Sequence, residues 1–378
     1  MHLLAYFFPQ DEKDHHRRGR ALLHGRTIIS DLELAREKGS ILGEKTTYCL
    51  GDPTEIQWLD SDQRTIARQL ELARSYGLYG FIVDTFIGCQ NSQPVEELGA
   101  TLDCISKLAF IEGVHFCLMS CLKLPRAILP VSKTIEETGR QLDLSFNTAK
   151  LIVDRVAQVW SNQNYIHIGG KPYLSLYGLL KGQDCHLMHQ FINSLRDYAY
   201  VTYRTELFLV GVGQIREDFE KLADAGFDEL TQYAGLPNFN SAKTKPIQDY
   251  RSQLELQIEM WTTLSSLGLT NFVPSVAVGW DASIRGETVD SLSEVIGMYP
   301  YTPIVVNKSL KLFSVYLNQV YAYLTHQDGQ DSKYLPIFAW NETGEGAALL
   351  PEVKDGVVDF SYLDVVLSFS KFLSNQGD

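Results

Sequence analysis

The feature that most constrains this chain is a recurrence of eight short apolar runs with the composition of β-strands. The runs are Leu3 to Phe8, Leu78 to Asp84, Val114 to Ser120, Pro172 to Tyr177, Glu206 to Val212, Glu229 to Tyr233, Asn271 to Val278 and Leu335 to Trp340. Segments with apolar residues at three- and four-residue intervals lie between them, which is the spacing of a helix face. Runs that are apolar along most of their length indicate strands buried on both faces, as in a parallel sheet covered by helices.

Eight repeats of strand and helix, closed by a last helical run at Tyr362 to Leu373, predict an α/β fold of the (β/α)8 or TIM barrel type. The barrel uses the whole chain, so we expect residues 1–378 to form a single domain, although the length would allow two. For the barrel to close, Leu3 and Leu335 must lie in neighbouring strands. The polar stretch Gln10 to Asp62 then becomes an elaborated first βα loop, with a helix expected at Asp31 to Lys38.

The charge of the chain excludes several classes of partner. Lys and Arg total 33 against 46 Asp and Glu, which gives a formal net charge of −13 and repels nucleic acids and anionic membranes. The sequence contains no run of eighteen apolar residues, the length that a membrane-spanning helix needs. The opening residues also lack a basic segment before their short apolar stretch. We therefore expect a cytoplasmic protein that binds no nucleic acid. The sequence does not indicate an oligomeric state.

The six cysteines form no CxxC pair, so we expect neither a structural metal nor a disulfide. The sequence also lacks the glycine-rich motifs that bind dinucleotides and the P-loop motif that binds nucleotide phosphates, and it predicts no cofactor.

In a barrel of this kind the active site lies at the carboxyl ends of the strands. The residues at those ends are mainly aromatic rings, carboxylates and amides, with few cations. Aromatic rings that stack on sugars, beside carboxylates and amides that bind hydroxyl groups, suit a neutral carbohydrate. The predicted substrate-binding residues are Tyr6, Asp84, Tyr177, Tyr233, Trp280, Asp281, Trp340 and Asn341.

The strongest catalytic candidates are Glu342 and Glu345, three residues apart on a glycine-flanked turn directly after the eighth run. Glycosyl transfer uses two carboxyl groups, one of which carries a proton for the departing oxygen. The alternative interpretation is a pair of solvated loop charges. The position at a predicted strand end, beside Trp340 and Asn341, favours a catalytic pair.

The segment Trp340-Asn341-Glu342-Thr343-Gly344-Glu345-Gly346 resembles the WNEWxEG signature of glycoside hydrolase family 99 and of the WbsX-like proteins. Four further segments resemble these families in the same order along the chain. They are Ala5 to Gln10, Gln69 to Phe81, Gly170 to Tyr173 with Leu176 and Tyr177, and Pro274-Ser275 with Gly279, Trp280, Asp281 and Arg285. Thr343 departs from the signature, which has a second Trp at that position.

Membership of family 99 would imply a retaining, endo-acting glycosidase on a (β/α)8 barrel. The resemblance implies that Glu342 deprotonates the substrate 2-hydroxyl group, which then attacks the anomeric carbon to form a 1,2-anhydro sugar. It implies that Glu345 is the general acid and then the base that activates water. Glu345 should therefore have a raised pKa, either from a less solvated environment or from the charge of Glu342.

Two alternatives stay open. A WbsX-like glycosyltransferase in surface-polysaccharide synthesis would use Glu345 or Asp84 as a base and a sugar nucleotide as donor. A sugar-binding barrel without catalytic turnover is the other.

Overall fold

In the computed structural model, the described parts of the chain are residues 1–10, 22–23, 26–27, 30–126, 129–132, 140–178, 185–326 and 334–376. All eight predicted runs form strands of one sheet. They are β1 (His2–Phe7), β4 (Gly80–Gln90), β6 (His115–Cys121), β8 (Lys171–Tyr177), β9 (Phe208–Gly213), β10 (Glu229–Gln232), the pair β12 (Phe272–Val273) and β13 (Val276–Ala277), and β15 (Tyr334–Phe338). Neighbouring strands along this path are parallel, in the order β12-β10-β9-β8-β6-β4-β1-β15-β13.

The sheet curls into a barrel through an interrupted seventh strand. β12 pairs with β10 and β13 pairs with β15, so the two ends of the sheet belong to one stretch of chain. Pro274 lies at the interruption and has no N–H to donate, which explains why the ladder breaks there. Leu3 pairs with Leu335, so the predicted neighbouring strands and the fold class are confirmed.

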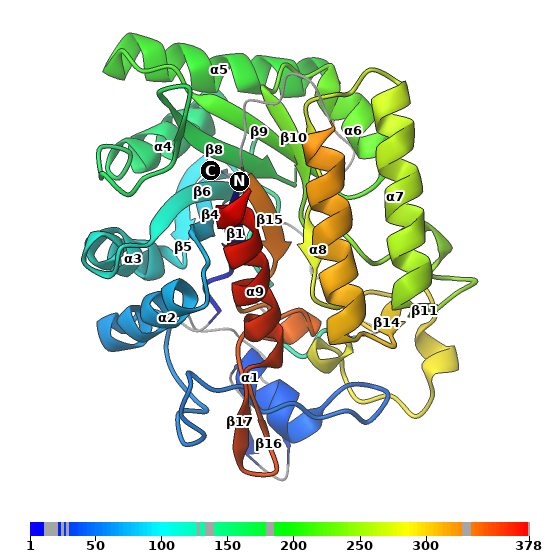
Figure 1. The fold of residues 1–378 in the computed structure, drawn as a ribbon. Coiled ribbons are helices and arrows are strands. Elements are labelled where there is room, and N and C mark those ends of the chain that lie inside the picture. Colours follow the sequence, from blue (N-terminus) through cyan, green and yellow to red (C-terminus); the bar gives the residue numbers. More distant parts are fainter. Residues whose placement is uncertain are drawn as a thin grey trace.

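Helices surround the strands, as Figure 1 shows. They are α2 (Gln63–Ser75), α3 (Gly99–Glu112), α4 (Phe146–Ala157), α5 (Cys185–Tyr203), α6 (Arg216–Ala223), α7 (Tyr250–Ser266), α8 (Leu310–Thr325) and α9 (Ser361–Asn375). Several begin where the sequence supplies a capping side chain. Asp62, Ser145, Asp249 and Ser309 each accept a hydrogen bond from a backbone N–H of the first turn of their helix.

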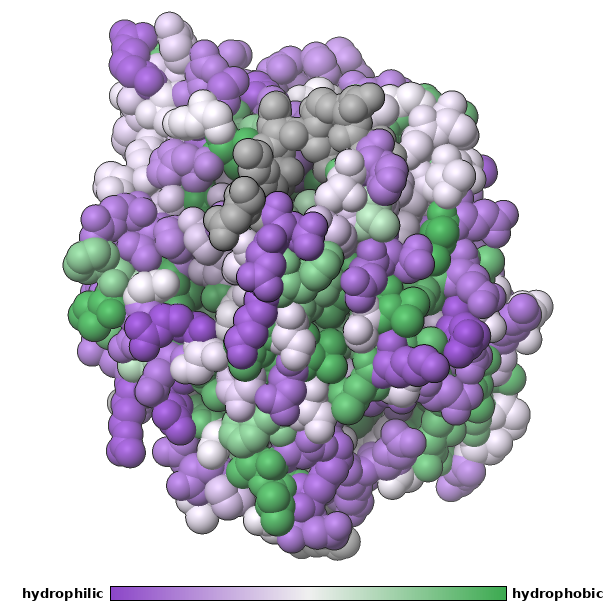
Figure 2. Space-filling view, viewed as in Figure 1, coloured by the Kyte–Doolittle hydropathy of each residue, from purple (hydrophilic) through white to green (hydrophobic). Residues whose placement is uncertain are grey.

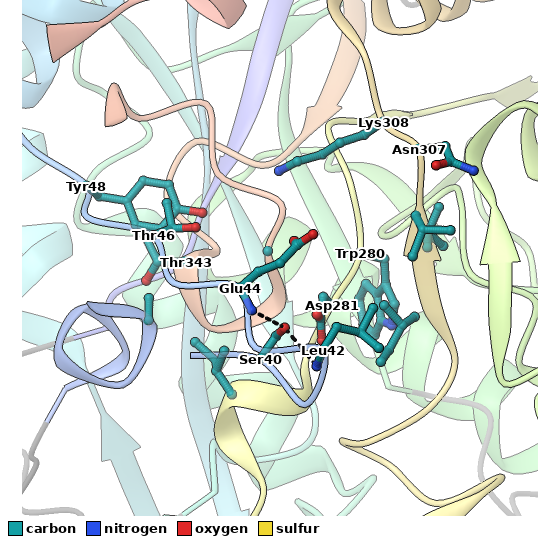
Figure 3. Close-up of a pocket in the computed structure, with 16 residues that line it drawn as sticks. Ser40, Leu42, Glu44, Thr46, Tyr48, Trp280, Asp281, Asn307, Lys308 and Thr343 are labelled. Carbon is teal, nitrogen blue, oxygen red and sulfur yellow. Dashed lines mark hydrogen bonds between the residues drawn. The ribbon is translucent and has the colours of Figure 1, made fainter. Parts of the chain in front are cut away.

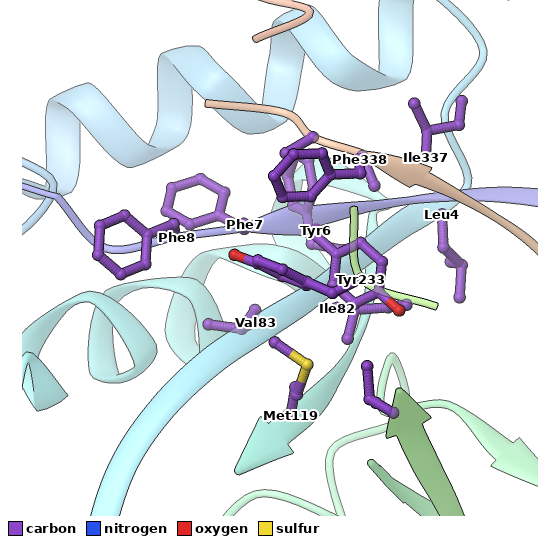
Figure 4. Close-up of a cluster of buried hydrophobic side chains, with 14 of the residues drawn as sticks. Leu4, Tyr6, Phe7, Phe8, Ile82, Val83, Met119, Tyr233, Ile337 and Phe338 are labelled. Carbon is purple, nitrogen blue, oxygen red and sulfur yellow. The ribbon is translucent and has the colours of Figure 1, made fainter. Parts of the chain in front are cut away.

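Aromatic side chains fill the barrel interior towards the carboxyl ends of the strands (Figure 4). The ring of Tyr233 meets those of Tyr6 and Phe338 edge to face, at centroid distances of 4.9 and 4.6 Å. Phe7 on the neighbouring position of β1 instead contacts Phe81. This alternation follows from the two-residue period of a strand and separates the barrel interior from the layer beneath the helices.

The first βα loop is elaborated as predicted. Its described part contains a short helix, α1 (Asp31–Glu33), which continues as one π-helical turn over Leu34–Lys38, close to the expected helix at Asp31 to Lys38. Ser30 caps it by accepting a hydrogen bond from the backbone N–H of Glu33. Smaller additions are β5 (Gln93–Glu97) against β4, the parallel pair β11 (Ile247–Asp249) and β14 (Ile304–Val306), and the hairpin β16 (Glu352–Lys354) and β17 (Val357–Asp359).

Hydrophilic residues cover much of the face seen in Figure 2, in keeping with the acidic composition. Within the described ranges, no helix is both long enough and apolar enough to cross a membrane. The six cysteines are free thiols, and Cys185 is the exposed one among them.

Candidate active site

Two buried carboxyl groups meet at a tyrosine hydroxyl group inside the barrel, where Asp84 lies in the middle of β4, Tyr233 follows β10 and Glu342 follows β15. The hydroxyl oxygen of Tyr233 lies 3.0 Å from Oδ2 of Asp84 and 3.0 Å from Oε1 of Glu342. A phenol has one hydrogen to donate, so it cannot satisfy two ionised carboxylates. One of the two carboxyl groups must therefore supply a proton of its own.

Asp84 is the better candidate to hold that proton. Its side chain is buried, and its other oxygen, Oδ1, has no hydrogen-bond partner among the described residues. Burial, followed by the negative charge of Glu342, raises the pKa of Asp84 well above its usual range. A protonated Asp84 can donate to the oxygen of Tyr233, which then donates to Glu342.

Glu342 and Glu345 lie on a tight turn that leaves β15. Thr343–Glu345 form one 3-10 turn, which ends at Gly346 with a φ of 63° in the left-handed region that favours glycine. Both glutamates are buried, with 3% and 7% of their surfaces exposed. The sequence spacing therefore places both carboxyl groups in one interior site, and the alternative of solvated loop charges is wrong.

Arg285 joins the two glutamates. Its Nη2 donates to Oε2 of Glu342 at 2.9 Å and its Nη1 donates to Oε1 of Glu345 at 2.8 Å. Nη2 and Nε also donate to Oδ2 of Asp31, at 2.7 and 3.1 Å. The guanidinium group of Arg285, a residue that is 7% exposed, is thus shared by three buried carboxyl groups. Its planar set of donors suits this arrangement, and a lysine would not reproduce it.

The two glutamates differ in what surrounds each oxygen. Both oxygens of Glu342 face donors, since Tyr233 lies at Oε1 and Arg285 at Oε2. For Glu345, Arg285 and the hydroxyl group of Tyr299 both contact Oε1, and Oε2 has no partner among the described residues. Oε2 is therefore the oxygen left to carry a proton.

Burial, followed by the negative charge of Glu342, raises the pKa of Glu345 to about 8, while Arg285 acts in the opposite direction. This is the direction that the sequence analysis predicts for a general acid at neutral pH. Burial also raises the pKa of Glu342, but Arg285 opposes this shift most strongly. A single positive charge next to several buried carboxyl groups leaves some of them protonated, and Asp84 and Glu345 are the two that Arg285 compensates least.

Tyr177 is close to this cluster, with its ring stacked on that of Tyr233 at a centroid distance of 5.0 Å. The predicted residues Asp84, Tyr177, Tyr233, Glu342 and Glu345 therefore come together at one end of the barrel.

Three other predicted residues build the frame of the site. Tyr6 is fully buried and donates to the backbone carbonyl of Gln232 at 2.9 Å. Trp340 is also fully buried and donates to the side chain of Gln69 on α2 at 2.8 Å. Asn341 forms two hydrogen bonds with the backbone of Phe8. The side chains of these three residues are engaged in hydrogen bonds within the protein, and their part in binding a sugar stays a prediction.

Trp280 and Asp281 lie on the neighbouring βα loop, beside the turn that carries Glu342 and Glu345. The backbone N–H of Asp281 donates to the carbonyl of Glu345 at 2.7 Å. Both side chains line a cavity of about 370 Å³ that neither Glu342 nor Glu345 lines (Figure 3).

The sequence analysis did not assign Arg285, Asp31 or Tyr299 to the site. Arg285 falls in a segment that resembles the two families, and that was the one signal that could have identified it. Asp31 contacts Arg285 across 254 positions of sequence, and Tyr299 is one of 19 tyrosines in the chain. Within the described residues, no group of three or more His, Cys, Asp or Glu side chains is arranged to hold a metal ion.

An acidic, aromatic-walled site at the carboxyl ends of an eight-stranded barrel defines a TIM-barrel protein of the carbohydrate-active class. Residues 140–366 match the family model described as Glycosyltransferase WbsX, a range that covers more than half of the chain. This chain belongs to that family. No curated protein sequence matches it.

Two solved structures share the fold. The GH99 endo-alpha-mannosidase from Bacteroides thetaiotaomicron is 12% identical in sequence and has a TM-score of 0.61, and the match covers 100% of this chain and 99% of that one. A protein described as glycoside hydrolase-like is 15% identical with a TM-score of 0.57, covering 85% of this chain and 89% of its own. These likenesses agree with the fold that the sequence predicts.

Proposed function

We propose that the protein is a retaining glycosidase that cleaves an oligosaccharide or polysaccharide, with Glu342 and Glu345 as its catalytic pair. The observation that carries this proposal is that one guanidinium group, Arg285, holds both glutamates within one buried site. The pair also differs in protonation, since Glu345 has the pKa of a group that keeps its proton near neutral pH. Glycoside cleavage requires this combination of one acid and one base.

In the first step, Glu342 takes the proton of the substrate 2-hydroxyl group, whose oxygen attacks the anomeric carbon. Glu345 gives its proton to the departing glycosidic oxygen as that bond breaks, so the products are a 1,2-anhydro sugar and a free alcohol. Glu345, now ionised, then takes a proton from water as the water opens the anhydro ring, and Glu342 returns a proton to the 2-oxygen. The donors of Arg285 and Tyr233 at Glu342 favour its ionised form before this sequence begins.

The test compares Glu345→Gln and Glu342→Gln on two kinds of substrate. Glu345→Gln should abolish turnover of sugars with poor leaving groups, while activated aryl glycosides should suffer less because their leaving group needs no proton. Glu342→Gln should abolish turnover of both. Proton NMR of the first product formed should show the anomeric configuration of the substrate. Wild-type turnover in both variants, on a substrate that the parent cleaves, would place the site elsewhere.

A second candidate is a glycosyltransferase, which the description of the family favours. A sugar-nucleotide donor needs cations or backbone N–H groups for its diphosphate. Among the described residues of the site, Arg285 is already shared by three carboxyl groups. Consumption of sugar nucleotides with an acceptor sugar, in the absence of oligosaccharide hydrolysis, would favour the transferase.

A further inference from the structure

The cavity of about 370 Å³ beside the catalytic turn, here termed the side pocket, has no part in the reaction steps above. Thr343 and Gly346, which lie on the same turn as Glu345, form part of its wall. The first βα loop supplies Glu44 and Tyr48, the loop after β13 supplies Trp280, and Lys308 precedes α8. The volume lies within the range of ordinary small-molecule sites.

The lining of the side pocket suits a ligand that carries hydroxyl groups and no net charge. Figure 3 shows Glu44 and Lys308 extending into the space between Tyr48 and Trp280. Glu44 and Lys308 form no ion pair with each other or with any other residue in the described ranges. Glu44 can accept hydrogen bonds from hydroxyl groups and Lys308 can donate to them. Because the pocket carries one side chain of each charge, it gives neither an anion nor a cation a net electrostatic advantage.

The side pocket is joined firmly to the catalytic turn. The backbone of Asp281 donates a hydrogen bond to the carbonyl of Glu345. In addition, the loop after β13 and the catalytic turn pack against each other at Gly279 and Gly346. A β-carbon on Gly279 would come within 2.8 Å of the carbonyl oxygen of Gly346, and one on Gly346 would come within 3.1 Å of the backbone nitrogen of Asp281. Contacts made in the side pocket can therefore help to hold the substrate in register with Glu345.

We propose that the side pocket is a subsite for a second, uncharged sugar residue of the substrate chain, next to the residue whose bond is cleaved. This inference rests on the proposed function. It predicts that binding strength depends on the length of the saccharide, because Glu44 and Lys308 line a cavity that neither glutamate lines.

The test uses Glu345→Gln as the parent, so that bound saccharides are not cleaved. The probes are D-mannose, D-glucose and D-galactose as free sugars, and the α-linked tetrasaccharide of each, with dissociation constants measured by titration calorimetry. Lys308→Ala and Glu44→Gln are added separately to this parent. The matched control is Lys311→Ala, an exposed lysine in the first turn of α8 that does not line the pocket.

For the tetrasaccharide that binds the parent best, Lys308→Ala and Glu44→Gln should each raise the dissociation constant about tenfold. Lys308→Ala removes a hydrogen bond to a charged group, and Glu44→Gln replaces a charged acceptor with a weaker neutral one. The same changes should leave the dissociation constant of the free sugar as it is, and Lys311→Ala should affect neither. Tetrasaccharide binding at parent strength in both pocket variants would overturn the subsite, as would equal losses for the free sugar and the tetrasaccharide. If the parent binds no saccharide of either length, the proposed function falls together with the subsite.

Discussion

The guanidinium group of Arg285 lies directly against the α-carbon of Gly344. A β-carbon at residue 344 would come within 2.2 Å of Nε and 2.4 Å of Nη2 of that arginine. The glycine between the two glutamates is thus the residue that lets one arginine reach both of them.

Gly344→Ala should displace Arg285 and separate it from Glu342 and Glu345. We expect a loss of about 1–3 kcal/mol in the free energy of unfolding, as for other overpacked sites. Turnover should fall by about 100-fold, since small displacements of catalytic groups have effects of that size. Urea denaturation and initial rates measure these two effects. Gly99→Ala is the control, because the three atoms nearest to a β-carbon there all belong to the side chain of Glu96, which is partly exposed and can move. Equal behaviour of the two variants would contradict the prediction.

Arg285→Met should be strongly destabilising at neutral pH, by about 3–5 kcal/mol, because it leaves Asp31 and Glu342 buried without their shared cation, whereas Glu345 already holds its own proton. The loss should shrink towards about pH 4, where the carboxyl groups take up protons and no longer need a counter-charge. Thermal unfolding of parent and variant between pH 4 and 8 measures the difference. A loss that is the same at every pH would show that packing, and not charge, explains the role of Arg285.

The raised pKa of Glu345 predicts how stability and activity change with pH. The folded protein keeps the proton of Glu345 up to about pH 8, whereas the unfolded chain releases it near its ordinary pKa of 4.5. Between these values the folded state binds more protons, so this group's contribution to stability falls as pH rises. The fall is at most about 1.4 kcal/mol for each pH unit. Glu345→Gln should lack this part of the slope in denaturation curves measured from pH 5 to 8.

Turnover should also decline above about pH 8, as the general acid loses its proton. A pH–rate profile on a substrate with a poor leaving group measures this decline. An aryl glycoside with an activated leaving group serves as the comparison, because its first step does not depend on the acid. If the rate of the first step declines at the same pH for both substrates, the decline belongs to a group other than Glu345.

Asp84→Asn should leave stability at pH 7 within about 0.5 kcal/mol of the parent, since an amide can donate to Tyr233 just as a protonated carboxyl group does. Asp84→Ala should cost about 1–3 kcal/mol, because it removes a buried hydrogen-bond partner. Infrared spectra at pH 7 should show a protonated carboxyl band in the parent that is reduced in Asp84→Asn. The exposed carboxylate Asp52, whose pKa is lowered by hydrogen bonds from Thr54, provides the control as Asp52→Asn. A parent spectrum that Asp84→Asn leaves unchanged would show that Asp84 is ionised.

The barrel, the order of its strands and the location of the glutamate pair could be predicted from the sequence alone. Apolar runs and helical periodicity are local patterns that survive in any fold able to bury them, and the pairing of Leu3 with Leu335 then follows from closing the barrel. The glutamates were identifiable because they directly follow a strand, where the backbone path alone brings them to the active face.

Which side chains face the site depends on how distant segments pack in three dimensions. Trp340 and Asn341 stand beside the glutamates in sequence, but their side chains turn towards Gln69 and the backbone of Phe8. Arg285 and Asp31 are distant in sequence, yet they complete the charge cluster. Past the last residue of a strand the regular alternation ends, so the direction of each side chain depends on the turn and on the loops packed against it. Arg285 is shared by Asp31 and the two glutamates because segments distant in sequence pack together, and no local sequence pattern predicts that packing.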